Sequence, residues 1–175
     1  MSKVSFDLTG KVALVTGATH GIGMAVAKGL AQQGATLCVN DINDEKLEAC
    51  KEVYKKDGID VYTLNFNVCS EEDVDRGISQ IEKDVGPVDI LVNNAGITHL
   101  PQAMEEVSED EFDRVFAVNA KSVYLSARSF VPHFKARKAG AILNIASTAG
   151  VSPRPNLNWY NASKGWMITA TKAMA

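Results

Sequence analysis

The sequence predicts an α/β domain with a doubly wound parallel sheet. Short apolar runs rich in β-branched residues alternate with longer segments of helical period along the whole chain. Parallel strands need crossover connections, and right-handed crossovers place helices on both faces of the sheet. The 175 residues carry no internal repeat, low-complexity tract or linker, and 46% of them are hydrophobic. These values are typical of one ordinary globular domain, so residues 1–175 are read as a single domain.

Each element has its own local signal. Apolar runs predict strands over residues 11–16, 36–40, 61–66, 89–93 and 141–145. Helices are expected over residues 22–33, 43–56 and 70–84, then from 108 past 130, and from about 159 to the end. Gly34 closes the first helix just past its end. Ser70 with Asp73 resembles a capping box, and Ser108 with Glu111 caps the fourth helix.

A glycine-rich turn joins the first strand to the first helix. Glycines there permit a tight turn and let the backbone approach a pyrophosphate, and the helix N-terminus offers free N–H groups to it. A tight turn without any ligand is the alternative. The strand–turn–helix context favours the dinucleotide site. The candidate cofactor-binding residues of this turn are Gly17, Thr19, His20, Gly21, Ile22 and Gly23.

Asp41, at the end of the second strand, predicts NAD rather than NADP as the cofactor. A carboxylate at this position accepts hydrogen bonds from a ribose and repels a 2′-phosphate. Asp41 could instead cap the following helix, but Asn43 competes better for that role. A protonated His20 near the ribose would tolerate a phosphate.

Ser147, Tyr160 and Lys164 form the candidate catalytic set. Tyr160 and Lys164 are four residues apart, so on a helix they share one face. A free phenol ionises near pH ~10, and an ammonium one turn away stabilises the phenolate. Ser147 follows a strand, where parallel sheets bind their ligands. A solvated lysine beside a half-buried tyrosine is the alternative, and the combination with the glycine turn disfavours it.

Together these segments resemble the short-chain dehydrogenase/reductases, over nearly the whole chain. The motifs are residues 16–23, the run Asn93-Asn94-Ala95-Gly96, and then Asn119, Ser147, Tyr160 and Lys164. The resemblance implies a Rossmann-type sheet of strand order 3-2-1-4-5 and a cofactor lying beside Asn94, Ala95 and Gly96. It implies that Tyr160 is the general acid/base, that Ser147 positions the substrate oxygen, and that Lys164 holds the nicotinamide ribose. Asn119 would hold a water of a proton relay, or it is a polar residue of the helix core.

The chain departs from the family pattern near the adenine. Asn67, followed by Val68, stands where the family usually has an aspartate, and its carbonyl can still accept from the adenine amino group. The first half is similar to gluconate 5-dehydrogenases, and the second half to sugar dehydrogenases or 3-oxoacyl carrier-protein reductases. His99, Arg154 and Trp159 lie on loops near the strand ends, where each either touches substrate or packs the loop.

The expected function is hydride transfer between NAD and a secondary alcohol or ketone, such as a sugar acid, polyol or keto ester. A non-catalytic NAD-binding module or inactive fragment is the alternative. Family members are longer, so we expect the C-terminal strands and much of the substrate pocket to be missing after Ala175. Family members form dimers or tetramers, and Phe130, Phe134 and Trp166 would then face a partner subunit.

Composition argues against other classes of protein. The net charge is −3 and no basic patch stands out, so no nucleic-acid partner is expected. No apolar run approaches the ~18 residues of a membrane span, and the N-terminus lacks a signal-peptide pattern. The three cysteines show no metal-ligand or CxxC spacing, which predicts free thiols, no metal and a cytoplasmic protein.

Overall fold

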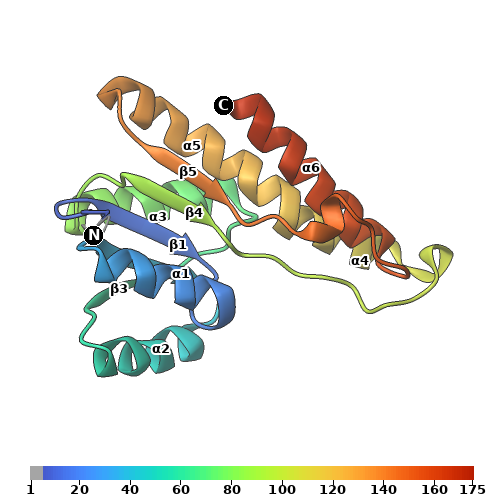
Figure 1. The fold of residues 1–175 in the computed structure, drawn as a ribbon, viewed down its shortest axis with the longest axis horizontal. Helices are drawn as coiled ribbons and strands as arrows, with labels where there is room; N and C mark the ends of the chain where they lie inside the picture. Colours follow the sequence, from blue (N-terminus) through green and yellow to red (C-terminus); the bar gives the residue numbers. More distant parts are fainter. Residues whose placement is uncertain (1–5) are drawn as a thin grey trace, which may run out of the picture.

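A five-stranded parallel sheet of order β3-β2-β1-β4-β5 forms the centre of the protein in a computed structural model, which describes residues 6–175 (Figure 1). The predicted fold class and strand order are confirmed. The strands are β1 (Val12–Thr16), β2 (Thr36–Asp41), β3 (Val61–Asn65), β4 (Ile90–Asn93) and β5 (Ala141–Asn144). The α-helices are α1 (Gly21–Gln32), α2 (Asp44–Lys56), α3 (Glu71–Asp84), α4 (Glu109–Phe116), α5 (Ser122–Arg137) and α6 (Asn158–Met174).

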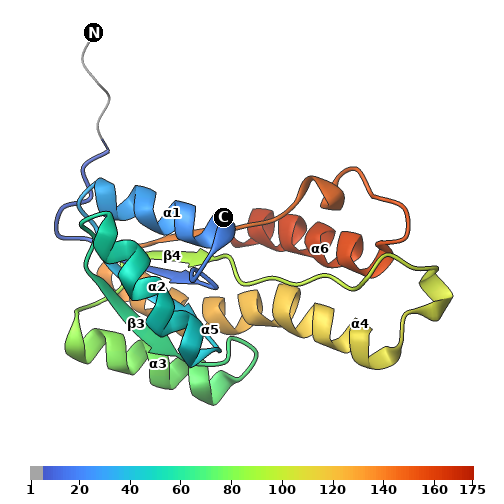
Figure 2. The ribbon, with the colours of Figure 1, turned by 90° about the horizontal axis from the view of Figure 1, so that it is seen from below.

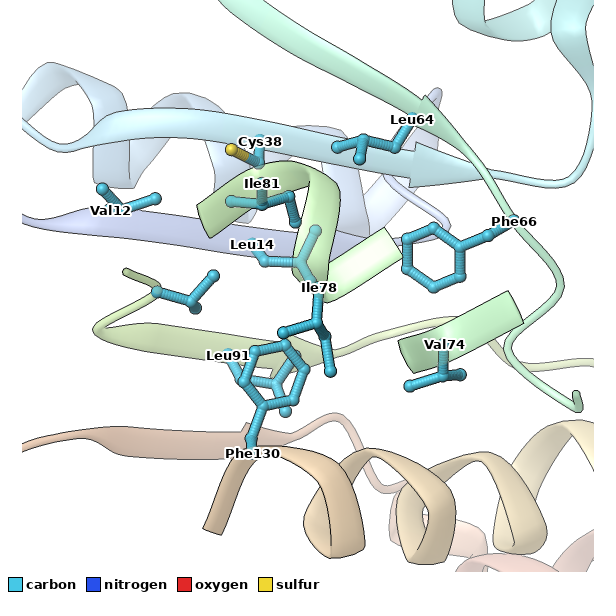
Figure 3. Packing of buried hydrophobic residues seen from close by; sticks show 11 residues of the cluster. Val12, Leu14, Cys38, Leu64, Phe66, Val74, Ile78, Ile81, Leu91 and Phe130 are labelled. Atoms are coloured by element: carbon cyan, nitrogen blue, oxygen red, sulfur yellow. The ribbon is translucent and has the colours of Figure 1, made fainter. Parts of the chain in front are cut away.

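Alternation along the strands divides the core into two clusters. Leu14 pairs with Cys38 of β2 and with Leu91 of β4, and these three side chains point to one face of the sheet. With Val74, Ile78 and Ile81 of α3, and with Phe130 of α5, they belong to what we call the α3-side cluster (Figure 3). The α1-side cluster on the opposite face contains Val15, Ala27, Val39, Leu47, Cys50, Tyr54 and Val92.

The first caps form largely as predicted. Asn43, rather than Asp41, caps α2 by accepting from the backbone N–H of Lys46 at 2.9 Å. Ser70 accepts from the N–H of Asp73 at 3.3 Å. The reciprocal half of that capping box does not form, because the Asp73 carboxylate accepts from the N–H of Asn67 instead.

The predicted long helix after Ser108 is interrupted. A π-helical segment, η2 (Ala117–Lys121), separates α4 from α5. Phe130 was expected to face a partner subunit, and this is wrong: its side chain is only 3% exposed and packs in the α3-side cluster. Phe134 packs partly buried against the same cluster, whereas Trp166 of α6 remains 40% exposed.

The segment after β4 runs beyond the sheet before the chain turns back into α4, at the end where α6 begins (Figures 1 and 2). It contains a single 3₁₀ turn, η1 (Met104–Glu106). A second 3₁₀ turn, η3 (Thr148–Gly150), follows β5 and contacts α6. Within residues 6–175, no helix has the length and apolar character needed to cross a membrane.

Candidate active site

A cleft of about 610 Å³ lies at the carboxyl ends of the strands, where open parallel sheets bind ligands. Its volume is in the range of ligand pockets, which is roughly 300–1,000 Å³. The cleft brings together most of the residues singled out in the sequence: Gly17, His20, Gly21, Ile22, Gly23, Asp41, Asn67, Val68, Asn94, Ala95, Gly96, Arg154, Tyr160 and Lys164. Residues far apart in the sequence therefore form one site.

The glycine turn has a conformation that side chains would disturb. Gly17 and Gly21 have φ angles of +62° and +58°, in the left-handed region. A Cβ on Gly23 would lie 2.4 Å from Nδ2 of Asn94 and 2.6 Å from the carbonyl oxygen of Gly17. His20, the residue before α1, makes no side-chain cap, so the first N–H groups of the helix have no such partner. The turn is shaped for a ligand that uses backbone groups, such as a phosphate.

The side chain of Asn94 links the glycine turn to the end of β4 by hydrogen bonds. Its Nδ2 donates to the carbonyl oxygens of Thr16 and Gly17, both at 2.9 Å. In return, the Thr16 hydroxyl oxygen accepts from the N–H groups of Asn94 and Ala95, both at 3.1 Å. The two strand ends are thus held in register where the cleft crosses them, and Asn94 and Ala95 form part of its floor.

A hydrogen-bond chain orients the carboxylate of Asp41. The Thr19 hydroxyl donates to Oδ2 of Asp41 at 2.7 Å, and Oδ1 accepts from the N–H of Asn43 at 3.1 Å. Since a hydroxyl carries one proton, the contact of 3.1 Å between Thr19 Oγ1 and Nδ1 of His20 requires the histidine to donate. Thr19 itself is buried and lies outside the cleft lining, so the structure places it behind Asp41.

Tyr160 and Lys164 lie one turn apart on α6, and both line the cleft. The ammonium of Lys164 donates to the carbonyl oxygen of Ile145 at 2.8 Å, and only 4% of the residue is exposed. Burial lowers the pKa of Lys164 from its ordinary value of 10.5. A cation of this kind, held against the end of β5, favours a developing negative charge nearby.

Ser147 lies directly after Ala146, which lines the cleft, although Ser147 is not itself part of the lining. Its hydroxyl oxygen accepts from the N–H of Ala149 at 3.1 Å and so begins η3. The turn then packs against α6 at Gly150, where a Cβ would lie 2.7 Å from the carbonyl carbon of Lys164. The turn that begins at Ser147 and the helix that carries Tyr160 and Lys164 are therefore placed relative to each other by direct backbone contact.

Asn119 lies in η2 and is fully buried behind the cleft. Its Nδ2 donates to the carbonyl oxygen of Ile97 at 2.8 Å and to Oγ of Ser163 at 2.9 Å. Its Oδ1 accepts from the N–H of Ile97 at 2.9 Å. The side chain thus links the segment after β4 to α6, and its predicted contact with a relay water stays a prediction.

The three loop residues have different surroundings. His99 is buried, and its Nδ1 contacts the carbonyl oxygen of Leu100 at 2.8 Å. Trp159 packs edge-on against Phe112 and donates to the carbonyl oxygen of Met104 at 3.3 Å. Of the three, Arg154 alone lines the cleft.

A family model described as short chain dehydrogenase matches residues 11–175. The chain belongs to the short chain dehydrogenase family. It is 40% identical over 176 residues to a 2-dehydro-3-deoxy-D-gluconate 5-dehydrogenase of Formosa agariphila, which covers 100% of this chain and 66% of that protein. The chain thus spans about two thirds of the length of this relative.

Solved structures of short chain dehydrogenases have the same fold. A 3-ketoacyl-(acyl-carrier-protein) reductase from Brucella melitensis, complexed with NADH, is 44% identical with a TM-score of 0.90, over 97% of this chain and 70% of that one. A gluconate 5-dehydrogenase from Burkholderia cenocepacia, in complex with NADP and tartrate, is 35% identical with a TM-score of 0.89. The match covers 97% of this chain and 66% of that one.

Several residues of this short chain dehydrogenase cleft were not singled out in the sequence. They are Asn40, Ile42, Phe66, Cys69, Ile97, Thr98, Val118, Ile145, Ala146 and Leu157. Most of them end or follow a predicted strand, and that position is a signal which could have found them. Within residues 6–175, no group of three or more His, Cys, Asp or Glu side chains is placed to hold a metal ion.

Proposed function

We propose that the protein transfers a hydride between NAD and a secondary alcohol or ketone, with Tyr160 as the general acid/base. The observation that carries this proposal is that Tyr160 and Lys164 line the same cleft as the glycine turn. The relatives named above are dehydrogenases of gluconates and a 3-ketoacyl-(acyl-carrier-protein) reductase, which favours a sugar acid or a keto ester as substrate. A polyol offers the same kind of secondary hydroxyl as a sugar acid.

The residues of the cleft fit a nicotinamide dinucleotide. Gly23 lets the start of α1 pack closely against Gly17 and Asn94, and the left-handed conformations of Gly17 and Gly21 shape the turn, which suits a pyrophosphate at the helix N-terminus. Asp41, at the end of β2, suits the hydroxyls of the adenosine ribose. Asn94, Ala95 and Gly96 would lie along the middle of the cofactor, and Lys164 would hold the ribose at the other end.

Each catalytic residue then has one task. A bound dinucleotide supplies the hydride acceptor or donor. Tyr160 takes the proton from the substrate hydroxyl during oxidation and returns it during reduction. Lys164 stabilises the phenolate, since its buried ammonium has only the Ile145 carbonyl as a hydrogen-bond partner within residues 6–175. Ser147 donates to the substrate oxygen, and Asn119 supports a water that exchanges the proton with solvent.

Substitution of Tyr160 tests the assignment. Tyr160→Phe should lower the rate of NADH formation from sugar acids and polyols by about 10²–10⁴-fold, because the general acid/base is lost. NAD affinity, measured by fluorescence titration, should remain within the wild-type range. Tyr62→Phe, in β3 and outside the cleft lining, is the matched control and should leave turnover unchanged. Full turnover by Tyr160→Phe would contradict the proposal, and NAD binding without turnover by the wild-type protein would favour a non-catalytic module.

The preference for NAD rests on Asp41. No Arg or Lys of residues 6–175 lines the adenosine end of the cleft beside it, and the carboxylate is held there by Thr19 and Asn43. Asp41→Asn keeps the size of the side chain and removes its charge. The ratio of kcat/KM for NAD to that for NADP should fall by about tenfold or more, which corresponds to roughly 1.4 kcal/mol. An unchanged ratio would refute this role.

We also propose a homo-oligomer, either a dimer or a tetramer, working in the cytoplasm. The exposure of Trp166 on α6 and of Tyr124 on α5 supports a subunit contact over these helices. The three cysteines are free thiols, in keeping with a reducing compartment. Sedimentation equilibrium of the wild-type protein and of Trp166→Lys tests the contact, and a monomeric wild-type protein would refute it.

A further inference from the structure

We infer that Arg154 selects substrates with a carboxylate, by pairing with that group while Tyr160 acts on the hydroxyl or ketone. The inference rests on the proposed function and names the recognition element of its site. The only carboxylate among the described lining residues is Asp41, at the end of β2. The lining also contains one arginine, Arg154, in the segment before α6, and one lysine, Lys164, on α6 itself.

Of these two cations, Lys164 already has a hydrogen-bond partner within the protein. Its ammonium is buried and donates to the carbonyl oxygen of Ile145. Arg154 is exposed, and within residues 6–175 no carboxylate lies within 4.0 Å of its guanidinium. A free guanidinium in a cleft offers two parallel N–H donors, which match the geometry of a carboxylate.

The backbone of Arg154 is tied to the catalytic helix. Its carbonyl oxygen accepts from Nδ2 of Asn161 at 2.8 Å, and Asn161 is the buried neighbour of Tyr160 on α6. Pro153 and Pro155 flank the arginine, and a residue before proline is restricted to extended conformations. The origin of the side chain is therefore fixed relative to Tyr160, while the guanidinium remains free to meet a ligand. An arginine that only interacts with solvent has no requirement for a backbone held by Asn161 or for a side chain that lines the cleft.

The test compares two substrates that differ in charge. Gluconate and glucitol share a carbon skeleton, but only gluconate carries a carboxylate. Arg154→Gln should lower the ratio of kcat/KM for gluconate to that for glucitol by about 10- to 100-fold, the range expected when a charge-assisted hydrogen bond is lost. Arg154→Lys should recover part of the ratio, since it keeps the charge but loses the two-pronged geometry. Arg76→Gln, which removes a guanidinium from α3 outside the cleft, should leave the ratio unchanged.

The outcomes separate this inference from the proposed function. An unchanged ratio in Arg154→Gln overturns the role of Arg154 while leaving the oxidoreductase proposal intact. A loss confined to NAD affinity also overturns it, because the arginine would then serve the cofactor. If the wild-type protein turns over neither of these substrates nor a keto ester, the proposed function fails, and calorimetry decides the inference directly. Gluconate should then bind to the wild-type protein in the presence of NAD about 10- to 100-fold more tightly than to Arg154→Gln, and equal affinities overturn the inference.

Discussion

A single methyl group on Gly150 should push η3 away from α6 and so change the geometry of the proposed active site. In Gly150→Ala the new Cβ would lie 2.7 Å from the carbonyl carbon of Lys164, 2.8 Å from the nitrogen of Gly165 and 2.9 Å from Cδ1 of Ile168. An ordinary carbon–carbon contact is about 3.5 Å, so η3 and α6 must move apart by about 0.8 Å. Two of the three obstructing atoms are backbone, and these atoms cannot rotate away.

The expected effect falls on both stability and rate. Overpacking of this kind costs about 1–3 kcal/mol of unfolding free energy. Because η3 begins at Ser147 and the contact is with Lys164, the displacement changes the spacing of two of the proposed catalytic groups. A misplacement of about 1 Å costs on the order of 10²-fold in rate, so we expect kcat to fall by about 10- to 100-fold.

Thermal unfolding followed by circular dichroism, together with kcat at saturating substrate, measures both effects. Gly29→Ala is the matched control, because Gly29 lies exposed within α1 and no atom from outside that helix comes within 4 Å of the added methyl group. That control should stabilise the protein by up to about 1 kcal/mol and leave kcat unchanged. Wild-type stability and wild-type kcat in Gly150→Ala would refute the reasoning.

Three other substitutions test separate parts of the structure. Lys164→Met should abolish turnover and raise the unfolding free energy by about 1 kcal/mol in urea titrations, since it removes a poorly compensated buried charge. The unfolded chain keeps the Lys164 proton to higher pH than the folded protein does. Between the lowered pKa and 10.5, its contribution to the unfolding free energy therefore rises with pH, and a titration of Lys164→Met should lack that rise. Leu14→Ala should cost about 2–5 kcal/mol in thermal unfolding, because this side chain is 1% exposed in the sheet. Asn94→Ala removes the donors to Thr16 and Gly17, so it should cost about 2 kcal/mol and weaken NAD binding in fluorescence titrations, and unchanged affinity would contradict its role in the turn.

Local signals in the sequence predicted the middle of the sheet because β1 and most of β2 are buried on both faces. Continuous apolar runs such as Val12–Thr16 are typical of parallel strands covered by helices on each side. The glycine turn was equally readable, since the left-handed conformations of Gly17 and Gly21 are ones that only glycine adopts readily. The four-residue spacing of Tyr160 and Lys164 directly placed both on one face of α6.

Features set by distant contacts could not be predicted in the same way. The π-helical segment at Ala117–Lys121 has no local signature, and Asn119 within it bonds to Ile97 and Ser163. Phe130 was misassigned to a subunit contact because helical period identifies an apolar face but does not say what covers it. The bond from Thr19 to Asp41 likewise depends on two segments meeting in space.

The division of the core into two clusters gives the protein a pair of internal chemical reporters. Cys38 lies in the α3-side cluster, and burial raises the pKa of its thiol to about 12. Cys50 lies in the α1-side cluster on the opposite face, and burial raises the pKa of its thiol as well. Since only the thiolate reacts with alkylating reagents, each cysteine is modified only when its own layer opens. The order in which the two sulfurs are alkylated would therefore reveal which layer of helices detaches from the sheet first.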